Sequence, residues 1–269
     1  MSLCLIAIFK NESHIIDEFI THYKNQGVDH FFLIDNGSDD NYIDKIKNFD
    51  NITLNIDSTK HCQEKHYNNY YLEKCKQFDW VIVCDFDEFI YARLKFKNIK
   101  EYLNTLSDDI SQVSIPWKMF GSSGFKEQPS SVIKNFTKRL NYDKTSNFSG
   151  VIIENTYKYS LTKCIVRTKY LTRFVNHKHY TTNSNWIGPD NNQLIHKSKE
   201  FYQINENILS NSFLHLNHYP IQSYDWFMRV KATRGDVNSS YYENHRGEKY
   251  FKEYDNSSSD INDFELANI

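Results

Sequence analysis

The chain has 269 residues, of which 39% are hydrophobic and 16% aromatic; this composition can fill a sizeable core and excludes a disordered chain. Its formal net charge of −2 gives no general electrostatic reason to bind nucleic acid. No apolar run approaches the roughly 18 residues of a membrane helix, so we expect no transmembrane segment, although peripheral membrane contact stays open.

Strands and helices are predicted to alternate through residues 1–91. The predicted strands are Ser2–Phe9, His30–Ile34, Ile52–Ile56 and a run that starts at Trp80. The predicted helices are one that Ser13 caps and Gly27 ends, then Tyr42–Phe49 and Glu64–Phe78. This order predicts a parallel sheet with right-handed crossovers.

Three carboxylates follow the last of these strands. The apolar run Trp80–Cys84 is typical of a buried central strand, and Asp85, Asp87 and Glu88 come directly after it. Ligands bind at the carboxyl ends of such strands. Acids gathered there would repel one another unless a cation or water relieved them. The Asp-x-Asp pair therefore indicates a Mg²⁺ or Mn²⁺ site that holds a diphosphate, with an ordinary solvated strand end as the alternative.

Two common nucleotide-binding classes are disfavoured by the loop after the first strand. Lys10-Asn11-Glu12 contains neither the Gly-x-Gly-x-x-Gly of dinucleotide dehydrogenases nor the Gly-x-x-x-x-Gly-Lys of P-loop NTPases. A nucleoside diphosphate fits the pattern better, because a carboxylate can bind ribose or base donors while a metal binds the phosphates.

The second half of the chain is less regular. Gly121 to Gly124 would let the backbone approach a ligand closely. His177 and His179 would share one face of an extended chain, and we interpret them as surface histidines. The expected elements are a helix at Ile99–Leu106, a strand at Gln112–Phe120, a short helix at Lys134–Leu140, strand-like segments over Tyr157–Val175, a turn at Trp186–Asp190, a strand at Ser212–Tyr219, a helix at Gln222–Gly235 and a frayed tail from Asn256.

Cysteine usage and the N-terminus predict a cytoplasmic protein. The five cysteines are an odd number and form no Cys-x-x-Cys pair, which indicates reduced thiols. The apolar run Leu3–Phe9 is stopped at once by Lys10, so it does not read as a signal peptide.

The chain resembles glycosyltransferases of the GT-A fold, most closely the family 2-like bacterial group and glycosyltransferase family 92. The resemblance extends over roughly residues 3–235. The motifs that carry it are Lys10-Asn11-Glu12, Asp17-Glu18-Phe19-Ile20, Gly27-Val28-Asp29-His30-Phe31, Ile34-Asp35-Asn36, Asp85-Phe86-Asp87-Glu88-Phe89, Phe120-Gly121-Ser122-Ser123-Gly124 and His218-Tyr219 followed by Lys231 and Arg234.

The resemblance implies an α/β GT-A fold: a Rossmann-like, mostly parallel sheet flanked by helices, with a mixed acceptor-side half. We expect one such domain at 1–236, with a nucleotide-binding half at 1–91 and an acceptor half at 92–236, and a C-terminal extension at 237–269. The implied activity is a metal-dependent, inverting transfer of a sugar such as galactose or glucose from a UDP-sugar to a glycan or glycolipid acceptor, in surface polysaccharide or glycoconjugate synthesis.

The resemblance also implies roles for individual residues. The metal, Mn²⁺ or Mg²⁺, would be held by Asp85, Asp87 and His218. Asp87, Asp225 and Asp236 are the candidate catalytic residues, the last two as possible bases together with Glu154. The nucleotide sugar would be bound by Lys10, Asn11, Glu12, Asp35, Asn36, Asp85, Lys231 and Arg234, and the acceptor by Trp117, Phe120, Gly121 and Ser122.

Two other classes stay open. A nucleotidyltransferase also uses paired acids and a metal on an α/β sheet, but it usually has a Gly-rich triphosphate loop near its N-terminus. A module that binds a nucleotide sugar or glycan without catalysis would not need an intact pair at Asp85 and Asp87.

Overall fold

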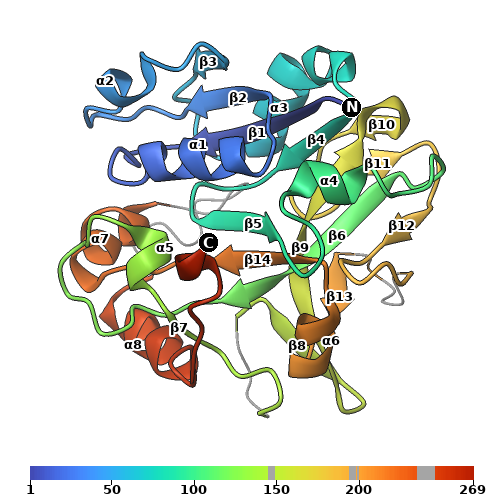
Figure 1. Cartoon of the computed structure of the whole chain (residues 1–269). Helices are drawn as coiled ribbons and strands as arrows, with labels where there is room; N and C mark the ends of the chain where they lie inside the picture. The colour runs from blue at the N-terminus through green and yellow to red at the C-terminus, as the bar shows by residue number, and fades with distance from the viewer. Residues whose placement is uncertain (145–148, 194–197, 199, 235–245) are drawn as a thin grey trace.

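The first four strands form the predicted parallel sheet. The computed structural model describes residues 1–144, 149–193, 198, 200–234 and 246–269. Within them β1 pairs with β2 and β4, and β2 with β3, all in parallel, which gives the order β3-β2-β1-β4 (Figure 1). The elements of this half are β1 (Leu3–Phe9), α1 (Ile16–Asn25), β2 (His30–Asp35), α2 (Ile43–Ile46), β3 (Ile52–Ile56), α3 (Gln63–Tyr71), the 3₁₀ turn η1 (Lys74–Gln77) and β4 (Trp80–Val83).

The same sheet continues into a mixed half. β9 lies antiparallel between β4 and β6, β14 runs parallel to β6, and β5 closes this path antiparallel to β14. The strands are β5 (Glu88–Ala92), β6 (Gln112–Met119), β7 (Lys138–Arg139), β8 (Val151–Glu154), β9 (Tyr157–Arg167), β10 (Leu171–Arg173), β11 (Tyr180–Thr181), β12 (Trp186–Ile187), β13 (Phe201–Gln203), β14 (Leu214–His218) and β15 (Ile261–Asn262). The helices are α4 (Ile99–Leu103), α5 (Val132–Asn135), α6 (Glu206–Asn211), α7 (Tyr224–Arg229) and α8 (Glu248–Ser257), with 3₁₀ turns η2 (Thr168–Tyr170), η3 (Lys231–Thr233) and η4 (Leu266–Asn268). The fold class is therefore the predicted one.

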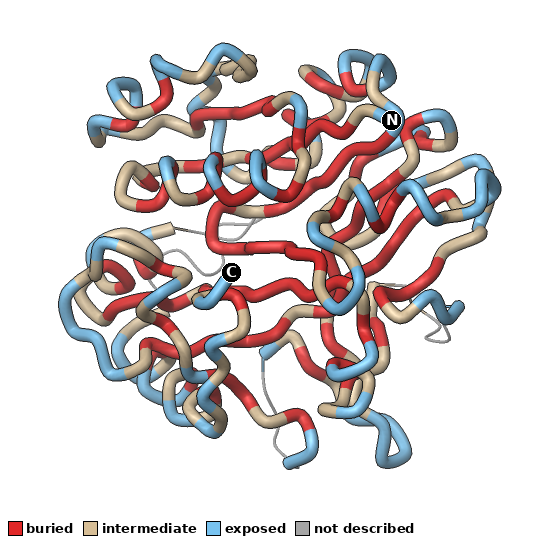
Figure 2. Tube along the Cα trace, viewed as in Figure 1, coloured by how far each residue is buried: buried red, intermediate tan, exposed pale blue. Residues whose placement is uncertain are grey.

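Both faces of the parallel half are covered, which explains why its strands are apolar throughout. Side chains of β1 alternate between two cores: Leu3 and Leu5 pack with Phe19 of α1, whereas Cys4 and Ile6 pack with Tyr71 of α3. Figure 2 shows the buried trace running through the centre of the molecule with exposed segments at its edge. The strand ends are therefore the places where polar groups meet solvent.

Several local predictions are wrong at element ends. Ser13 does not cap α1: the N-cap is Ile15 with no side-chain hydrogen bond, and the amide of Ser13 donates to Asp40 instead. Gly27 does end that helix, with a φ of +92° that favours glycine. The predicted helix at 64–78 stops at Tyr71 before η1, the helix at 134–140 is replaced by α5 and β7, and the first two residues of the expected turn at 186–190 form β12.

The helix predicted at 222–235 is shorter in the structure. Ser223 is its N-cap, since its hydroxyl accepts a hydrogen bond from the amide of Trp226, and α7 ends at Arg229 before η3. Gly235 lies outside the described residues. Position 236, where we placed the domain boundary, lies there too, so that boundary stays a prediction.

The C-terminal tail is ordered, and the prediction that it frays is wrong. β15 pairs antiparallel with β7, and Leu266 is buried in the main core. Asp263 bridges two cations that are largely removed from solvent, Lys118 at 2.8 Å and Arg139 at 2.7 Å. Glu265 binds Arg93 at 2.7 Å and hydrogen-bonds Tyr91. The polar sequence of the tail suggests that the tail is solvated. In the structure its acids instead pair with cations that are buried on the neighbouring strands.

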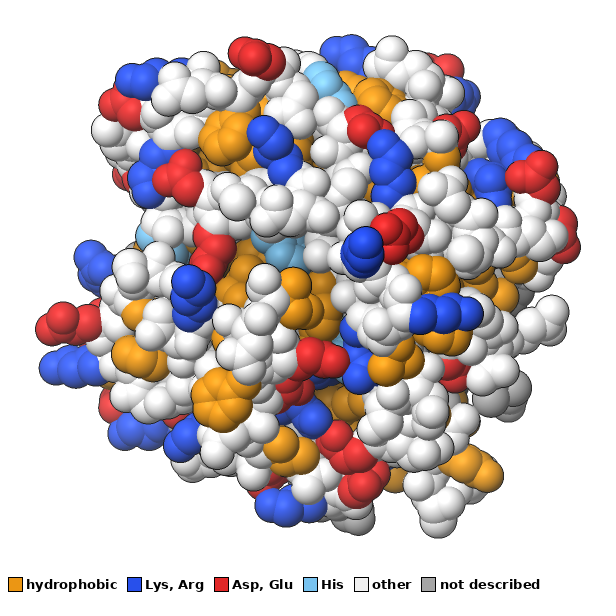
Figure 3. Space-filling view, viewed as in Figure 1, with side chains coloured by type: hydrophobic (Ala, Val, Ile, Leu, Met, Phe, Trp, Pro, Cys, Tyr) orange, Lys and Arg blue, Asp and Glu red, His pale blue; other side chains and the backbone are white. Residues whose placement is uncertain are grey.

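Two further features concern the charged side chains on the surface and the length of the helices. On the face in Figure 3, basic and acidic side chains are interspersed rather than gathered by sign. No helix within the described ranges combines the length and apolarity that a bilayer span requires.

Asp263→Asn should lower the free energy of unfolding by about 3 kcal/mol, because the buried Lys118 loses its nearest anion and Arg139 keeps only Glu206. Burial would raise the pKa of Asp263, but Lys118 and Arg139 outweigh it and lower the pKa to about 2. A lowered carboxyl pKa stabilises the fold above the unfolded value of 3.8 and ceases to do so as the pH falls through about 2. Chemical denaturation should therefore show the deficit of the variant shrinking below about pH 4.

Asp108→Asn is the matched control, since Asp108 also pairs with an arginine but its side chain is 91% exposed. That variant should unfold like the wild type. Equal stability of both variants at neutral pH would show that the tail carboxylate is not needed to compensate Lys118 and Arg139.

Candidate functional site

The three acids lie in a tight connection between two buried strands. The amide of Glu88 donates to the carbonyl of Asp85 at 3.1 Å, and the amide of Asp85 donates to the Glu88 carboxylate at 2.8 Å. Asp87 is 3% exposed and Glu88 is fully buried. The chain reverses direction between β4, which runs parallel to β1, and β5, which runs antiparallel to β14. All three carboxylates therefore lie where β4 ends and β5 begins.

Lys163 of β9 compensates the first acid. Its ammonium lies 2.9 Å from the Asp85 carboxylate and 3.7 Å from that of Glu88, and its side chain is only 1% exposed. Burial alone would raise the pKa of Asp85, but Lys163 outweighs it and lowers the pKa. Burial raises the pKa of Glu88 well above its ordinary value, against the opposing effect of Lys163. Within this cluster the pKa of Asp85 is therefore lowered and that of Glu88 is raised.

Asp87 faces two groups from the C-terminal part of the chain. One carboxylate oxygen lies 2.6 Å from the ammonium of Lys231, and the other lies 3.7 Å from Nε2 of His218. Burial would raise the pKa of Asp87, but Lys231 and His218 outweigh it and lower the pKa to about 2. Burial lowers the pKa of His218 to about 4, although Asp87 opposes this shift. At neutral pH an ionised carboxylate thus faces a neutral imidazole.

The donor set around Asp87 fits a divalent cation. Ligand atoms of Asp87, Glu88 and His218 all lie within 4.8 Å of one another. One Glu88 oxygen and Nδ1 of His218 are buried without a hydrogen-bond partner. Carboxylate oxygens with a neutral imidazole suit Mn²⁺ better than Mg²⁺, which prefers oxygen alone. Glu88 was missing from the predicted ligand set, and its place directly after Asp87 in the sequence was the available signal.

A further acid, in the loop after β1, is also compensated by a residue from the C-terminal part of the chain. Glu12 is 3% exposed, and one of its oxygens lies 2.8 Å from the guanidinium of Arg234. Arg234 also donates to the backbone carbonyl of Lys10. The loop after β1 is thereby tied to the residues after η3, over 220 positions later in sequence.

The loops after β1, β2 and β3 interlock through polar side chains. The amide of Asn11 donates to the hydroxyl of Ser38, and Asn36 donates to the carbonyls of Asp57 and Thr59. Asp35 accepts from the Ser38 amide at 2.8 Å and from the Tyr42 hydroxyl at 3.0 Å. Its carboxylate therefore holds a turn.

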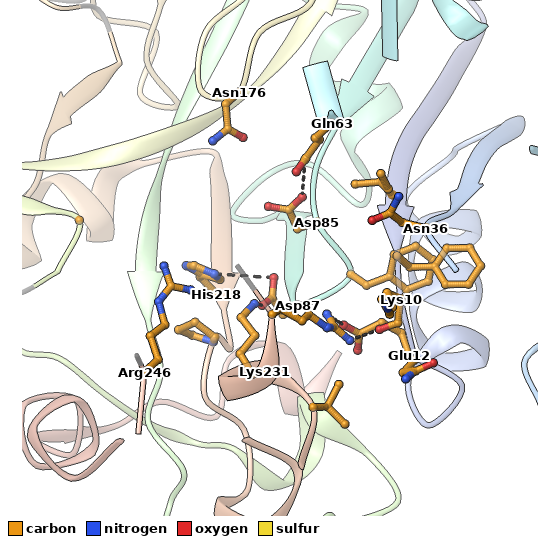
Figure 4. A pocket seen from close by; sticks show the side chains of 18 of the residues that line it. Lys10, Glu12, Asn36, Gln63, Asp85, Asp87, Asn176, His218, Lys231 and Arg246 are labelled. Carbon is orange, nitrogen blue, oxygen red and sulfur yellow. Dashed lines mark hydrogen bonds and ion pairs between the residues drawn. The ribbon is translucent and has the colours of Figure 1, made fainter. Parts of the chain in front are cut away.

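One cavity of about 470 Å³ joins these groups. Figure 4 shows Asp85, Asp87, His218 and Lys231 facing a common space, with Lys10, Glu12 and Asn36 along one side of it. Of the predicted nucleotide-sugar and metal ligands, the cavity is lined by Lys10, Asn11, Glu12, Asn36, Asp85, Asp87, His218, Lys231 and Arg234, but not by Asp35.

On the acceptor side the structure brings only part of the predicted set to the cavity. Trp117 lines it and packs against His218, with ring centroids 4.3 Å apart. Phe120 is fully buried against Tyr219, and the space over Gly121 is filled by Ser258 and Asp255. The amide of Ser122 donates to Asp255. Phe120, Gly121 and Ser122 thus contact core and tail rather than cavity.

The candidate bases lie elsewhere or outside the described residues. Asp225 is in the first turn of α7 and does not line the cavity. Glu154 is exposed at the end of β8. Asp236 lies outside the described residues.

Sequence reasoning missed other residues at this cavity. Gln63 donates to Asp85 at 3.0 Å, and Asn176, His177, Tyr250 and Tyr254 line the wall. The interpretation of the two histidines as surface residues is wrong, because His177 lines the cavity and His179 is 1% exposed. These residues come from segments whose sequence carries no distinctive motif.

Comparison with known proteins identifies a family. The profile of Glycosyltransferase family 92 matches residues 1–262. A family 92 glycosyltransferase from Ricinus communis is 22% identical over 147 residues, covering 51% of this chain and 26% of that protein. One from Oryza sativa is 25% identical over 146 residues, covering 52% of this chain and 25% of that protein. This chain thus matches about a quarter of the length of these curated relatives.

Solved structures are more distant. HddC from Yersinia pseudotuberculosis has a TM-score of 0.35 and 12% identity, with 63% of this chain and 78% of that chain covered. The mannosyltransferase Ktr4p from S. cerevisiae has a TM-score of 0.27 and 12% identity, with 45% of this chain and 40% of that chain covered. Scores this low do not establish a common fold.

Lys163→Met should destabilise the protein at neutral pH, because it leaves the half-buried Asp85 and the buried Glu88 without their counter-ion. Without that ammonium, burial and Asp87 would raise the pKa of Asp85. A raised carboxyl pKa makes the deficit large at alkaline pH and smaller as the pH falls and Asp85 takes up a proton. Thermal unfolding across pH measures this trend.

Adding Asp85→Asn to Lys163→Met should recover part of the lost stability, since it removes the unpaired charge. Lys169→Met is the control, because Lys169 lies just after the same strand but is half exposed. A double variant no more stable than Lys163→Met alone would show that the two residues do not act as a pair.

Proposed function

The chain belongs to glycosyltransferase family 92, and from this membership we propose that it is a metal-dependent, inverting glycosyltransferase. It would move a hexose, galactose or glucose, from a UDP-sugar to a glycan or glycolipid acceptor in surface polysaccharide or glycoconjugate synthesis. The observation that best supports this proposal is the buried carboxylate of Asp87, which faces His218 and Lys231 in a cavity at the strand ends.

The charge distribution suits the departure of a nucleoside diphosphate. Negative charge grows on the diphosphate as the glycosidic bond breaks, so groups that stabilise the charge must lie ready at that point. Lys231 and Arg234 line the cavity beside Asp87 and Glu12 and can donate to phosphate oxygens. A cation held by Asp87, Glu88 and His218 would supply Lewis acidity to the leaving group.

The remaining residues orient the two substrates. Asn11 and Asn36 line the nucleoside end and are fixed by the interlocked loops. Trp117, which packs against His218, offers an aromatic surface in the cavity wall on which a sugar ring can pack.

The cysteines are compatible with action in the reducing cytoplasm, the compartment that we propose. All five are free thiols, and four of them are buried. Cys84 lies in one core, Cys4 and Cys75 lie in the core on the other face of the sheet, and Cys164 contacts Ser114. None therefore contributes a covalent staple to the fold.

Calorimetry tests the proposal. UDP should bind weakly in the presence of a chelator and about tenfold or more tightly with Mn²⁺, and Asp87→Ala should abolish this gain. Asp79→Ala is the control, because Asp79 precedes the other end of β4 and is more than half exposed. Its response to Mn²⁺ should match that of the wild type.

Turnover separates the open classes. A glycosyltransferase should slowly hydrolyse its UDP-sugar in the absence of acceptor and release UDP, in a panel of nucleotide sugars with and without Mn²⁺. Release of pyrophosphate from UTP and a sugar phosphate would indicate a nucleotidyltransferase instead. Metal-independent UDP binding without any hydrolysis would indicate a binding module and contradict the proposal.

A further inference from the structure

The shortest contact of the Asp87 carboxylate is with a lysine. The ammonium of Lys231 lies 2.6 Å from one oxygen, while the imidazole of His218 lies 3.7 Å from the other. The carboxylate side chain is 4% exposed, so water screens this ion pair weakly. Any divalent cation that binds Asp87 has to share the carboxylate with an ammonium or replace it.

The two lysines that compensate the acidic turn differ in freedom. Lys163 lies within β9, is 1% exposed and is bracketed by Asp85 and Glu88. Lys231 begins a three-residue 3₁₀ turn, and 22% of its side chain is exposed to the cavity. A flexible four-carbon stem lets such an ammonium move between nearby anions. Lys163 is thus a fixed counter-ion, whereas Lys231 can exchange partners.

Resting on the proposed function, we propose that Lys231 competes with the divalent cation for Asp87 and that the diphosphate of the donor relieves this competition by taking the ammonium. Two like charges beside one buried carboxylate repel each other strongly at low dielectric. A diphosphate in the same cavity offers Lys231 a second anion close to the first. Metal and donor therefore bind cooperatively, and each strengthens the binding of the other by the same factor.

The competition predicts that removing Lys231, although it helps to bind the nucleotide sugar, should strengthen the binding of the metal. Lys231→Met should bind Mn²⁺ alone roughly tenfold more tightly than the wild type, because no ammonium opposes the metal. The same variant should bind UDP in the presence of Mn²⁺ more weakly, because the diphosphate loses a partner. If Lys231 served only the diphosphate, the first effect would not occur.

Electron paramagnetic resonance of free Mn²⁺, with and without UDP, measures both effects on the whole chain. The wild type should gain Mn²⁺ affinity when UDP is added, whereas Lys231→Met should gain much less. Lys231→Arg keeps the charge and should behave like the wild type. Lys249→Met is the matched control, because it removes the same charge from a side chain that is 88% exposed on α8. Cooperative thermal unfolding of every variant would show that the fold is kept, even if loss of the counter-ion of Asp87 lowers the melting temperature of Lys231→Met.

Two negative outcomes are distinct. If Mn²⁺ strengthens UDP binding in the wild type but Lys231→Met binds Mn²⁺ alone no more tightly, Lys231 does not compete for Asp87 and the proposed function stands. If neither protein binds Mn²⁺ with or without UDP, the metal-dependent function itself is wrong, and the competition with it. Tighter Mn²⁺ binding by Lys249→Met as well would reduce the effect to net charge and overturn the role of Lys231.

Discussion

Compensation of the carboxylates at the end of β4 is the constraint on which the rest of the site depends. Three acids follow a buried strand within four positions, and each is compensated differently: Asp85 by Lys163, Asp87 by Lys231, and the fully buried Glu88 by the amide of Asp85 and the more distant ammonium of Lys163. No local sequence can supply these cations. β9 must lie antiparallel between β4 and β6 to deliver Lys163, and the residues after α7 must return across the strand ends to deliver Lys231. The mixed half of the sheet is thus required by the charge of the parallel half.

The tail applies the same physics at a second place. Lys118 and Arg139 are buried by the strands that carry them; Glu206 already pairs with Arg139, and Asp263, which follows α8, bridges both cations. Tyr250 and Tyr254 of that helix line the cavity, so anchoring the tail also fixes part of the cavity wall. Burial of cations in one region therefore shapes the site in another, through packing rather than through direct contact with a ligand.

Sequence patterns predicted the elements that depend on neighbouring residues alone. The parallel strands could be predicted because each is an apolar run next to turn residues. The acidic turn could be singled out because three acids directly follow such a run, with a solvated strand end as the alternative. Lys163, Gln63 and Asn176 could not be predicted as site residues, because what brings them there is strand order, and one lysine in a strand looks like any other. Gly121 was misassigned for a related reason: a glycine permits close approach, but sequence does not say whether a ligand or, as here, α8 approaches.

Charge balance also bears on how the site can be filled. Asp85 and Asp87 are each paired to a lysine and Glu12 is paired to Arg234, so the acids that line the cavity are compensated from within the chain. A divalent cation alone would add two positive charges to a poorly screened space, and a dianionic nucleotide sugar alone would add two negative ones. Both together leave the balance unchanged, which is the cheapest way to bring charge into a low-dielectric site. A site built with its own cations should therefore take the metal together with the anionic donor rather than alone.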